Sequence, residues 1–379
     1  MILNLALACL ALLSIVLLIW QWLAARKFPL HKRITVHGTL PAVTLLKPLK
    51  GVEPATADCL RSWLRQDYPG TIQVLFAVAS HADPVCELVT TLMKEHPGID
   101  AELVVVEHLI GPNAKVSKLA ELEQRAKHDV FVVSDADVRV PADFLQQVVS
   151  ALGDSKVGLV NCFYRLANPS TLPMQWESIA INADFWSQVL QSRMLKPLDF
   201  ALGAVMVTHR RHVQEIGGFK SLADCLADDY QLGHRIAKAG GKIALSEVVV
   251  ECWDAPMSWR AVWKHQLRWA RTIRVCQPIP YFFSILSNPL LWALIWVLAV
   301  PQRWSWITLI AAVILRAWIS HDLQRRLNRS NHHAAFVGMT PLKDLLQVAL
   351  WFFAFAGNTV EWRGRKFRLR ADGTLEEVT

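Results

Sequence analysis

Long uncharged stretches lie toward both ends of this chain. Residues 1–25 carry no charged side chain, and residues 275–302 are also uncharged. Residues 304–320 are apolar apart from Arg316, and a last apolar run covers residues 345–360. About 20 apolar residues span a bilayer. The pattern therefore predicts an N-terminal transmembrane anchor, a helical hairpin, and a shorter last segment that re-enters the membrane or lies in its plane.

Basic residues that flank these segments set the predicted orientation. They form three clusters, at Arg26, Lys27, His31, Lys32 and Arg33, at Arg325, Arg326 and Arg329, and at Arg363, Arg365, Lys366, Arg368 and Arg370. The positive-inside rule keeps such clusters in the cytoplasm. We therefore expect an uncleaved anchor with its N-terminus outside and a hairpin that turns near Arg303. Arg316 is expected to snorkel toward the nearer interface.

The middle of the chain alternates between β-rich runs and helical patterns. The predicted strands and helices are, in chain order, Ala42–Leu46, Pro54–Gln66, Ile72–Ala79, Pro84–Glu95, Ala101–Glu107, Lys115–Ala126 and Val130–Val133. This order predicts the α/β class with a mostly parallel sheet covered on both faces. Ligands bind beyond the carboxyl ends of such strands. The predicted domains are the anchor (1–25), a catalytic domain (34–274), membrane helices (275–360) and a basic tail (361–379).

Composition narrows the classes of protein that remain. The 379 residues are 53% apolar and 19% charged, and they include 16 Trp. Such a chain has too much apolar surface to remain disordered, and Trp is enriched at membrane surfaces. The net charge of +8 lies in membrane-proximal clusters, so anionic lipid explains it and no nucleic acid partner is expected. The seven Cys lack the spacing of a zinc or disulfide framework, which fits a reducing compartment.

A pair of carboxylates follows the fourth predicted strand. Asp135 and Asp137 stand two residues apart, so both side chains can point to one side of an extended backbone. Two carboxylates at a strand end can hold Mg²⁺ or Mn²⁺, which in turn binds a diphosphate. Turn chemistry is the simpler explanation of an isolated Asp-x-Asp, because Asp is common where strands end.

Two further segments carry candidate side chains. Asp228 and Asp229 begin a helical run, where one Asp is expected to cap the helix and the other is a candidate general base. His265, Arg268 and Trp269 precede the second apolar segment, and they would also suit an interfacial anchor. The sequence contains no GxGxxG, Walker A, GxSxG or HExxH motif. Dinucleotide-binding, P-loop, α/β-hydrolase and zinc-protease chemistry is therefore not supported.

The order of the motifs resembles that of the ceramide glucosyltransferases, which are inverting, metal-dependent nucleotide-sugar transferases with a GT-A fold. The matching stretches cover nearly the whole chain, and they are LLKPLKGVEP (Leu45–Pro54), QDYPG (Gln66–Gly70), Asp83-Pro84, KVSKL (Lys115–Leu119), SDADVRVP (Ser134–Pro141), GLVNCFYR (Gly158–Arg165), LADDYQLG (Leu226–Gly233), HQLRW (His265–Trp269) and WRGRKFRLR (Trp362–Arg370). Two longer stretches, Tyr164–Gln191 and Glu251–Trp259, are similar to the bacterial hopanoid-biosynthesis members of this group.

The resemblance implies a role for each matching residue. Asp135 and Asp137 would hold Mg²⁺ or Mn²⁺, and Asp229 would be the base, with Asp228 as its neighbour or cap. His265 stands where the family has Gln or Arg, and a His can still donate to a phosphate oxygen. The residues expected to contact the substrates are Asp83, Lys115, Asp135, His265, Arg268 and Trp269.

The activity implied by the resemblance is transfer of a sugar from a UDP-sugar to a lipid hydroxyl with inversion. The expected sugar is N-acetylglucosamine, and the expected acceptor is a hopanoid such as bacteriohopanetetrol. Ceramide glucosylation from UDP-glucose is the alternative within the same chemistry. A processive polysaccharide synthase and a non-catalytic lipid-binding membrane protein are further alternatives. The expected location is the bacterial inner membrane, with several membrane passes and the catalytic domain in the cytoplasm.

Overall fold

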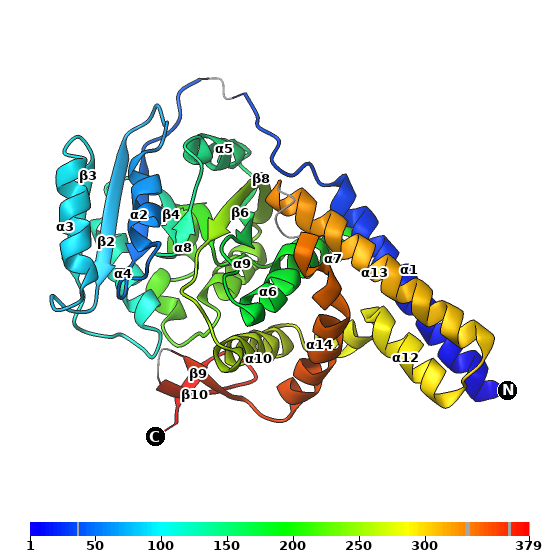
Figure 1. Cartoon of the computed structure of the whole chain (residues 1–379). Helices are drawn as coiled ribbons and strands as arrows, with labels where there is room; N and C mark the ends of the chain where they lie inside the picture. The colour runs from blue at the N-terminus through cyan, green and yellow to red at the C-terminus, as the bar shows by residue number, and fades with distance from the viewer. Residues whose placement is uncertain (36–37, 330–333, 363–364, 379) are drawn as a thin grey trace.

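A computed structural model describes residues 1–35, 38–329, 334–362 and 365–378. Arg363, which belongs to the last predicted basic cluster, lies outside these ranges. Figure 1 shows an α/β body from which a helical arm projects, with the N-terminus at the far end of the arm. The predicted combination of a mixed α/β body with apolar helices is thus confirmed.

The first half of the body is a parallel sheet in the order β3-β2-β1-β4. Its strands are β1 (Val43–Pro48), β2 (Ile72–Val78), β3 (Asp100–Val105) and β4 (Val130–Ser134). The connecting helices are α2 (Thr56–Leu64), α3 (Val85–Glu95) and α4 (Ala114–Arg125). Each of these elements was predicted from the sequence, with bounds that differ by only a few residues.

Burial on both faces explains why these strands were recognisable. All six residues of β1 are buried, and Val43 stands opposite both Ile72 of β2 and Val130 of β4. Alternate residues then point to opposite faces. Leu45 joins the core formed with α2 and α3, and Leu46 joins the core formed with α4. The parallel arrangement also brings the carboxyl ends of these strands to one edge.

The sequence pattern does not predict the second half of the sheet. Here β7 (Val205–His209) pairs antiparallel with β4, and the order continues through β6 (Val157–Leu166), β8 (Lys242–Cys252) and β5 (Val138–Arg139). The described residues thus form an eight-stranded sheet. This half matters for function because the segments before β7 and after β8 reach the same edge of the sheet as β4.

Shorter helices surround this second half. They are α5 (Phe144–Ser150), η1 (Ala151–Gly153), α6 (Leu172–Ile179), α7 (Trp186–Leu195), α8 (Arg210–Glu215), η3 (Phe219–Leu222), α9 (Asp228–Lys238) and α10 (Trp259–Cys276). Between α6 and α7 the helix continues as a π-helical segment, η2 (Ala180–Phe185). Such segments are rare inside helices and are frequent at functional sites.

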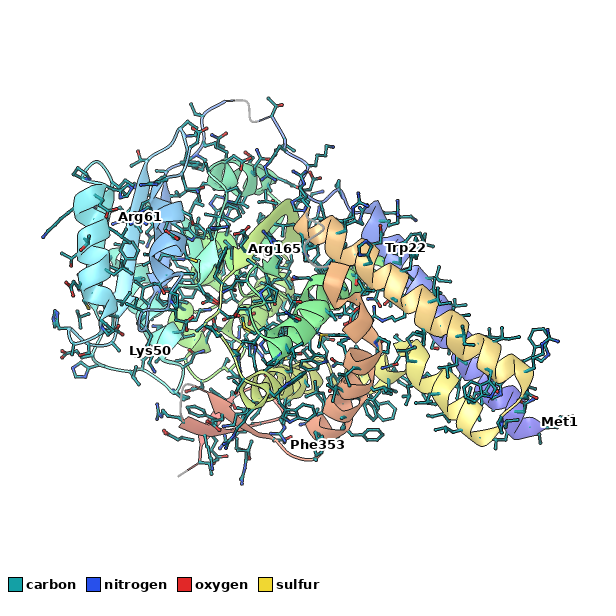
Figure 2. The ribbon with its side chains drawn as sticks, in the orientation of Figure 1. Met1, Trp22, Lys50, Arg61, Arg165 and Phe353 are labelled. Carbon is teal, nitrogen blue, oxygen red and sulfur yellow. The ribbon has the colours of Figure 1, made fainter. Side chains whose placement is uncertain are left out.

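The arm consists of α1 (Ile2–Lys27), α12 (Pro289–Ala299) and α13 (Arg303–Asn328). In the described residues, α1 and α13 are long and apolar enough to cross a membrane. A third span is possible if α12 is combined with the preceding α11 (Pro278–Phe283) and η4 (Ser284–Ser287), from which it is bent by 57°. Asn4 accepts hydrogen bonds from Trp296 at 2.7 Å and Gln302 at 2.9 Å. The N-terminus and the α12–α13 turn therefore share the far end of the arm (Figure 2).

The last apolar segment forms α14, which begins at Thr340 and ends at Phe355. It follows η5 (Ala334–Met339) and starts and ends before the predicted range of 345–360. The chain then enters a small antiparallel sheet of β9 (Thr359–Trp362), β10 (Arg365–Leu369) and β11 (Leu375–Glu377). Leu375 N–H donates to the Asp224 carbonyl at 2.7 Å. The C-terminal sheet thus packs on the segment that leads into α9.

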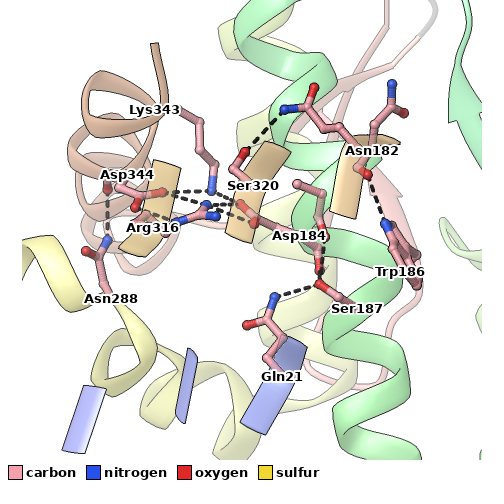
Figure 3. Close-up of polar contacts among 12 residues, drawn as sticks. Gln21, Asn182, Asp184, Trp186, Ser187, Asn288, Arg316, Ser320, Lys343 and Asp344 are labelled. Atoms are coloured by element: carbon pink, nitrogen blue, oxygen red, sulfur yellow. Dashed lines mark hydrogen bonds and ion pairs between the residues drawn. The ribbon is translucent and has the colours of Figure 1, made fainter. Parts of the chain in front are cut away.

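Arg316 is buried, so the prediction that it snorkels to the interface is wrong. Its guanidinium donates to Asp344 and to both oxygens of Asp184, in each case at 2.8 Å. Lys343 also donates to Asp184 and, at 3.3 Å, to Asp344 (Figure 3). We call these four residues the charge quartet. Two cations and two anions balance one another, which makes their joint burial tolerable. The quartet connects α13 and α14 to η2 of the α/β body.

Candidate functional site

The predicted site residues Asp83, Asp135 and Asp137 follow β2 and β4 at one edge of the sheet. The carboxylate of Asp83 accepts hydrogen bonds from the backbone of Gly51 and of Val85, each at 3.0 Å. Gly51 has a φ of 70°, which favours glycine. Asp83 therefore ties the loop after β1 to the loop after β2, where a nucleotide would be expected.

Lys115, in the first turn of α4, brings two of the predicted acids together. Its Nζ lies 2.8 Å from Asp135 Oδ1 and 3.2 Å from Asp228 Oδ2. The Lys115 side chain is 8% exposed, whereas that of Asp135 is 40% exposed and so remains accessible to a ligand. Burial alone would lower the pKa of Lys115, but the two carboxylates raise it above its usual value. Lys115 therefore stays charged beside the end of β4.

Asp228 does not cap α9, so the predicted role of a cap is wrong for this residue. The N-cap position is Ala227, and no side chain caps this end of the helix. Asp228 instead points into the body, where Asn113 Nδ2 donates to it at 3.3 Å and Lys115 faces its other oxygen. The buried ammonium of Lys115, which Asp228 shares with Asp135, explains an Asp at this position better than helix capping does.

Asp137 lies in a strongly acidic part of the site. Removal from water raises the pKa of Asp137 to about 7, and the charges of Asp135 and Asp254 act in the same direction. Asp254 follows β8, and burial raises its pKa to about 6. Across the described ranges, no three His, Cys, Asp or Glu side chains are arranged to hold a metal ion. A cation bound by Asp135 and Asp137 would thus need further oxygen ligands from a substrate or from water.

Asp229 is the neighbour of Asp228 on α9 and faces a different partner. Its Oδ1 accepts a hydrogen bond from the Tyr230 backbone at 2.8 Å. Its Oδ2 lies against Gly203, where a Cβ atom would come within 2.6 Å of it. Burial and the charge of Asp228 raise the pKa of Asp229 to about 6, although Lys115 opposes the shift. A carboxylate with such a pKa is suited to accept a proton near neutral pH.

Helix α10 carries the remaining predicted residues. His265 Nδ1 lies 2.7 Å from Glu177 Oε1, which also accepts a hydrogen bond from Gln266 at 2.8 Å. The ring of Trp269 packs 4.8 Å from that of His265. Arg268 lines a groove between α10 and the C-terminal sheet, together with three other cations at Lys264, Arg271 and Lys366. Helix α10 therefore supports the C-terminal sheet, and the charge of His265 also acts on Asp254 beyond the end of β8.

Comparison of the sequence with known protein families identifies the family to which this chain belongs. The sequence model described as Glycosyl transferase family 21 matches residues 6–375. The chain belongs to glycosyl transferase family 21. The match begins inside α1 and continues through the whole eight-stranded sheet and α12–α13, so the apolar helices and the acidic edge of this glycosyltransferase belong to one family pattern.

Named relatives are consistent with this assignment. The family 21 chain is 22% identical to ceramide glucosyltransferase 3 of Caenorhabditis elegans, over 97% of this chain and 80% of the relative. It is 32% identical to ceramide glucosyltransferase of Komagataella phaffii, over 38% of this chain and 31% of the relative. Among solved structures, it is similar to the mannosyltransferase PcManGT from Pyrobaculum calidifontis in complex with GDP-Man and Mn²⁺. That likeness has a TM-score of 0.50 at 20% identity and covers 89% of this chain and 99% of the other, which shows a shared GT-A fold.

Sequence reasoning missed two charged residues of the family 21 site. Lys47, at the end of β1, donates to the Asp135 carbonyl at 2.5 Å and to Ser134 Oγ at 3.2 Å. Burial lowers the pKa of Lys47 to about 8. Glu177, which holds His265, is fully buried on α6. The sequence signal for Lys47 was a Lys inside the apolar run VTLLKP. Nothing in the local sequence around Glu177 distinguishes that residue.

The family 21 site combines three kinds of group that a sugar transfer needs. Asp135 and Asp137 offer hard oxygen ligands at a strand end. Lys115 offers positive charge that can stabilise a phosphate leaving group, whereas the structure places Arg268 in the groove beside the C-terminal sheet. Asp229 offers a proton acceptor on the adjoining helix α9. This set is suited to displacement of a diphosphate by an alcohol.

Proposed function

We propose that this glycosyltransferase moves a sugar from a UDP-sugar to the hydroxyl of a membrane lipid, with inversion at the anomeric carbon. The observation that supports this most directly is the position of Asp229. Its carboxylate has a raised pKa, and the charges of Lys115 and Asp135 act on it. A proton acceptor therefore lies beside the carboxylate pair at which a nucleotide diphosphate would bind.

The residues at the end of β4 fit a divalent cation. Asp135 and Asp137 supply hard carboxylate oxygens of the type that Mg²⁺ and Mn²⁺ prefer. A cation at the end of β4 would be stabilised by the surrounding negative charge, which is shown by the effect of Asp135 and Asp254 in raising the pKa of Asp137. When bound, Mg²⁺ or Mn²⁺ would neutralise negative charge on the diphosphate as it leaves. The mannosyltransferase with the similar fold was solved with Mn²⁺, which agrees with this proposal.

The chain's own groups account for the transfer step. The acceptor oxygen forms a bond to the anomeric carbon while the bond from that carbon to the diphosphate oxygen breaks. The hydroxyl proton passes to Asp229, whose Oδ1 is held by the Tyr230 backbone. Lys115 and Asp83 keep the surrounding loops in place. Attack from the side opposite the leaving group gives inversion in a single displacement.

Two acceptors are compatible with a site that adjoins membrane helices. A hopanoid such as bacteriohopanetetrol, glycosylated with N-acetylglucosamine, is supported by the similarity of residues 164–191 and 251–259 to hopanoid-biosynthesis enzymes. Ceramide, glycosylated with glucose, is supported by the names of the curated relatives. A processive synthase is less well supported, since the described residues provide at most three spans. A non-catalytic lipid-binding protein is also less well supported, because it would not require a proton acceptor beside the carboxylate pair.

The location proposed for the enzyme is the bacterial inner membrane, with the α/β body in the cytoplasm. The basic ends of α1 and α13 lie where the arm meets the body, as the positive-inside rule requires. A cysteine at the exposed position Glu107, in a Cys9→Ser background, should react with an impermeant maleimide only after cell lysis. Labelling of intact cells would contradict this orientation.

A direct assay of transfer tests the proposed function. Purified chain in nanodiscs is incubated with UDP-glucose or UDP-N-acetylglucosamine and with ceramide or bacteriohopanetetrol. Products are identified by mass spectrometry, and their anomeric configuration is determined by NMR. We expect one donor–acceptor pair to react with inversion, and Asp229→Asn to lower turnover about a hundredfold or more.

The matched control is Asp67→Asn, which makes the same change at an exposed residue before β2, at the opposite edge of the sheet. It should keep full turnover. Transfer to neither lipid, or retention of configuration in the product, would overturn the proposal. Equal turnover of the two variants would show that the base lies elsewhere.

A further inference from the structure

A second basic pocket lies outside the catalytic site, where α13 ends beside the segment that follows α1. It has a volume of about 270 Å³ and is lined by Leu30, His31, Asp322, Arg325, Arg326 and Arg329. This volume equals the share of about nine molecules of liquid water. The pocket is therefore large enough for a small polar headgroup.

The charges around this pocket are unbalanced. Asp322, the only acid among the described residues that line it, is already engaged by the Trp22 indole at 2.8 Å and by Arg26 at 3.5 Å. Within the described ranges, none of Arg325, Arg326 and Arg329 forms an ion pair with a carboxylate. The Arg326 guanidinium donates to the Arg26 carbonyl at 3.2 Å, and its buried Nε has no partner in the described structure.

Backbone contacts keep the pocket in shape. Nε2 of His31 lies 3.1 Å from the Arg326 carbonyl and 3.0 Å from the Leu327 carbonyl. Arg329 donates in return to the His31 carbonyl at 3.1 Å. Both His31 and Arg329 have positive φ angles, 64° and 51° respectively. The segment after α1 and the end of α13 thus hold each other in a fixed arrangement.

The position of the pocket along α13 puts it just beyond the expected depth of lipid headgroups, within reach of a long side chain. The rings of Trp22 and Trp318 pack 5.0 Å apart, and paired Trp residues mark the boundary of the hydrocarbon layer. With a rise of 1.5 Å per residue, Arg325 lies about 10 Å beyond Trp318 along α13. The headgroup layer on each side of a bilayer is about 5–8 Å thick. An Arg side chain bridges the remaining distance, so phosphate groups of the leaflet can reach the pocket.

We propose that this pocket binds the phosphodiester of an anionic phospholipid in the leaflet that faces the α/β body. The guanidinium groups match the oxygens of a phosphate in geometry as well as in charge. Arg325 is exposed and lines the pocket with no carboxylate partner in the described structure, so it supplies the contact that a lipid would complete. Such a lipid would fix the depth and tilt of the arm relative to the body.

Native mass spectrometry of the delipidated chain tests this proposal. The chain is titrated separately with phosphatidylglycerol, with phosphatidylcholine and with inorganic phosphate. We expect preferential binding of phosphatidylglycerol and about tenfold weaker binding in Arg325→Gln, the loss of one charge-assisted contact. Arg325→Lys should be intermediate, because it keeps the charge and loses the planar donor pair.

The matched control is Arg303→Gln, which removes the same charge from the exposed far end of the same helix. It should bind phosphatidylglycerol as the wild type does. Equal affinity of Arg325→Gln and the wild type would overturn the proposal and leave the cluster a role in orientation only. Preferential binding of inorganic phosphate would also overturn it, because the pocket would then be a site for a free anion. Thermal melting in phosphatidylcholine nanodiscs verifies that each variant is folded.

Discussion

Replacement of Gly203 by alanine is the sharpest test of the position of the base. The added Cβ atom would lie 2.6 Å from Asp229 Oδ2, whereas ordinary contacts begin at about 3.4 Å. The carboxylate must therefore move by roughly 0.8 Å, the difference between these two distances. It can do so by side-chain rotation, at the expense of the hydrogen bond from the Tyr230 backbone.

Catalysis should suffer much more than stability from this change. A displacement of about 1 Å in a reacting group can lower a rate about a hundredfold, so we expect turnover of Gly203→Ala to fall about 10- to 100-fold. Overpacking typically costs about 1–3 kcal/mol of folding free energy. The lower chain entropy of alanine in the unfolded state offsets about 0.4–1 kcal/mol of it. The melting temperature should therefore change by only a few degrees.

The assay compares Gly203→Ala with Gly98→Ala, at which an added Cβ atom would meet nothing within 4 Å. Both variants are measured for turnover, for UDP-sugar affinity by calorimetry, and for thermal melting. We expect Gly98→Ala to behave as the wild type does in all three. Gly203→Ala should keep its donor affinity and lose turnover. Full turnover in Gly203→Ala would refute the view that the Asp229 carboxylate acts from the position that it holds beside Gly203.

Three further predictions concern the same site. Since burial raises the pKa of Asp229 to about 6 and a protonated carboxyl cannot accept a proton, kcat/KM should fall about tenfold per pH unit below 6 and level off above it. A pH profile without that acidic limb would contradict the role of base. Asp228→Asn should lower both melting temperature and turnover, because it weakens the charge pair that holds Lys115. Unchanged melting temperature and turnover would show that Asp135 alone is sufficient to hold Lys115 in place. Chelation with EDTA should abolish transfer, with recovery in Mn²⁺ or Mg²⁺, and full activity in EDTA would exclude a metal on Asp135 and Asp137.

The first four strands could be predicted because their signal is local. A strand that is buried on both faces, such as β1, appears as an uninterrupted apolar run. Strand β8 mixes Lys242, Ser246 and Glu247 with its apolar residues, and its position depends on its pairing with β6. No local pattern contains that information, so the antiparallel half of the sheet was not predicted.

The candidate site shows the same limit. Asp135 follows a recognisable strand, so its place at the edge of the sheet could be predicted. Asp228 looked like a helix cap because two adjacent Asp residues at a helix start are usually explained in that way. Its actual partners are Asn113, the N-cap of α4, and Lys115 in the first turn of that helix, and only the folded chain brings α4 and α9 together. Resemblance to a family supplied the proposed role of Asp229, but for Asp228 it left only the choice between a neighbour and a cap.

The charge quartet has a consequence for the order in which the protein is assembled. During synthesis, Arg316 follows Asp184 and precedes Lys343 and Asp344. When α13 has just been synthesised, Asp184 is the one other member of the quartet that already exists. Its carboxylate reaches its final position only after η2 has formed. A guanidinium without a partner is costly inside a bilayer. The α/β body should therefore acquire structure before α13 and α14 close on it, so assembly after α1 would proceed from the sheet to the C-terminal helices.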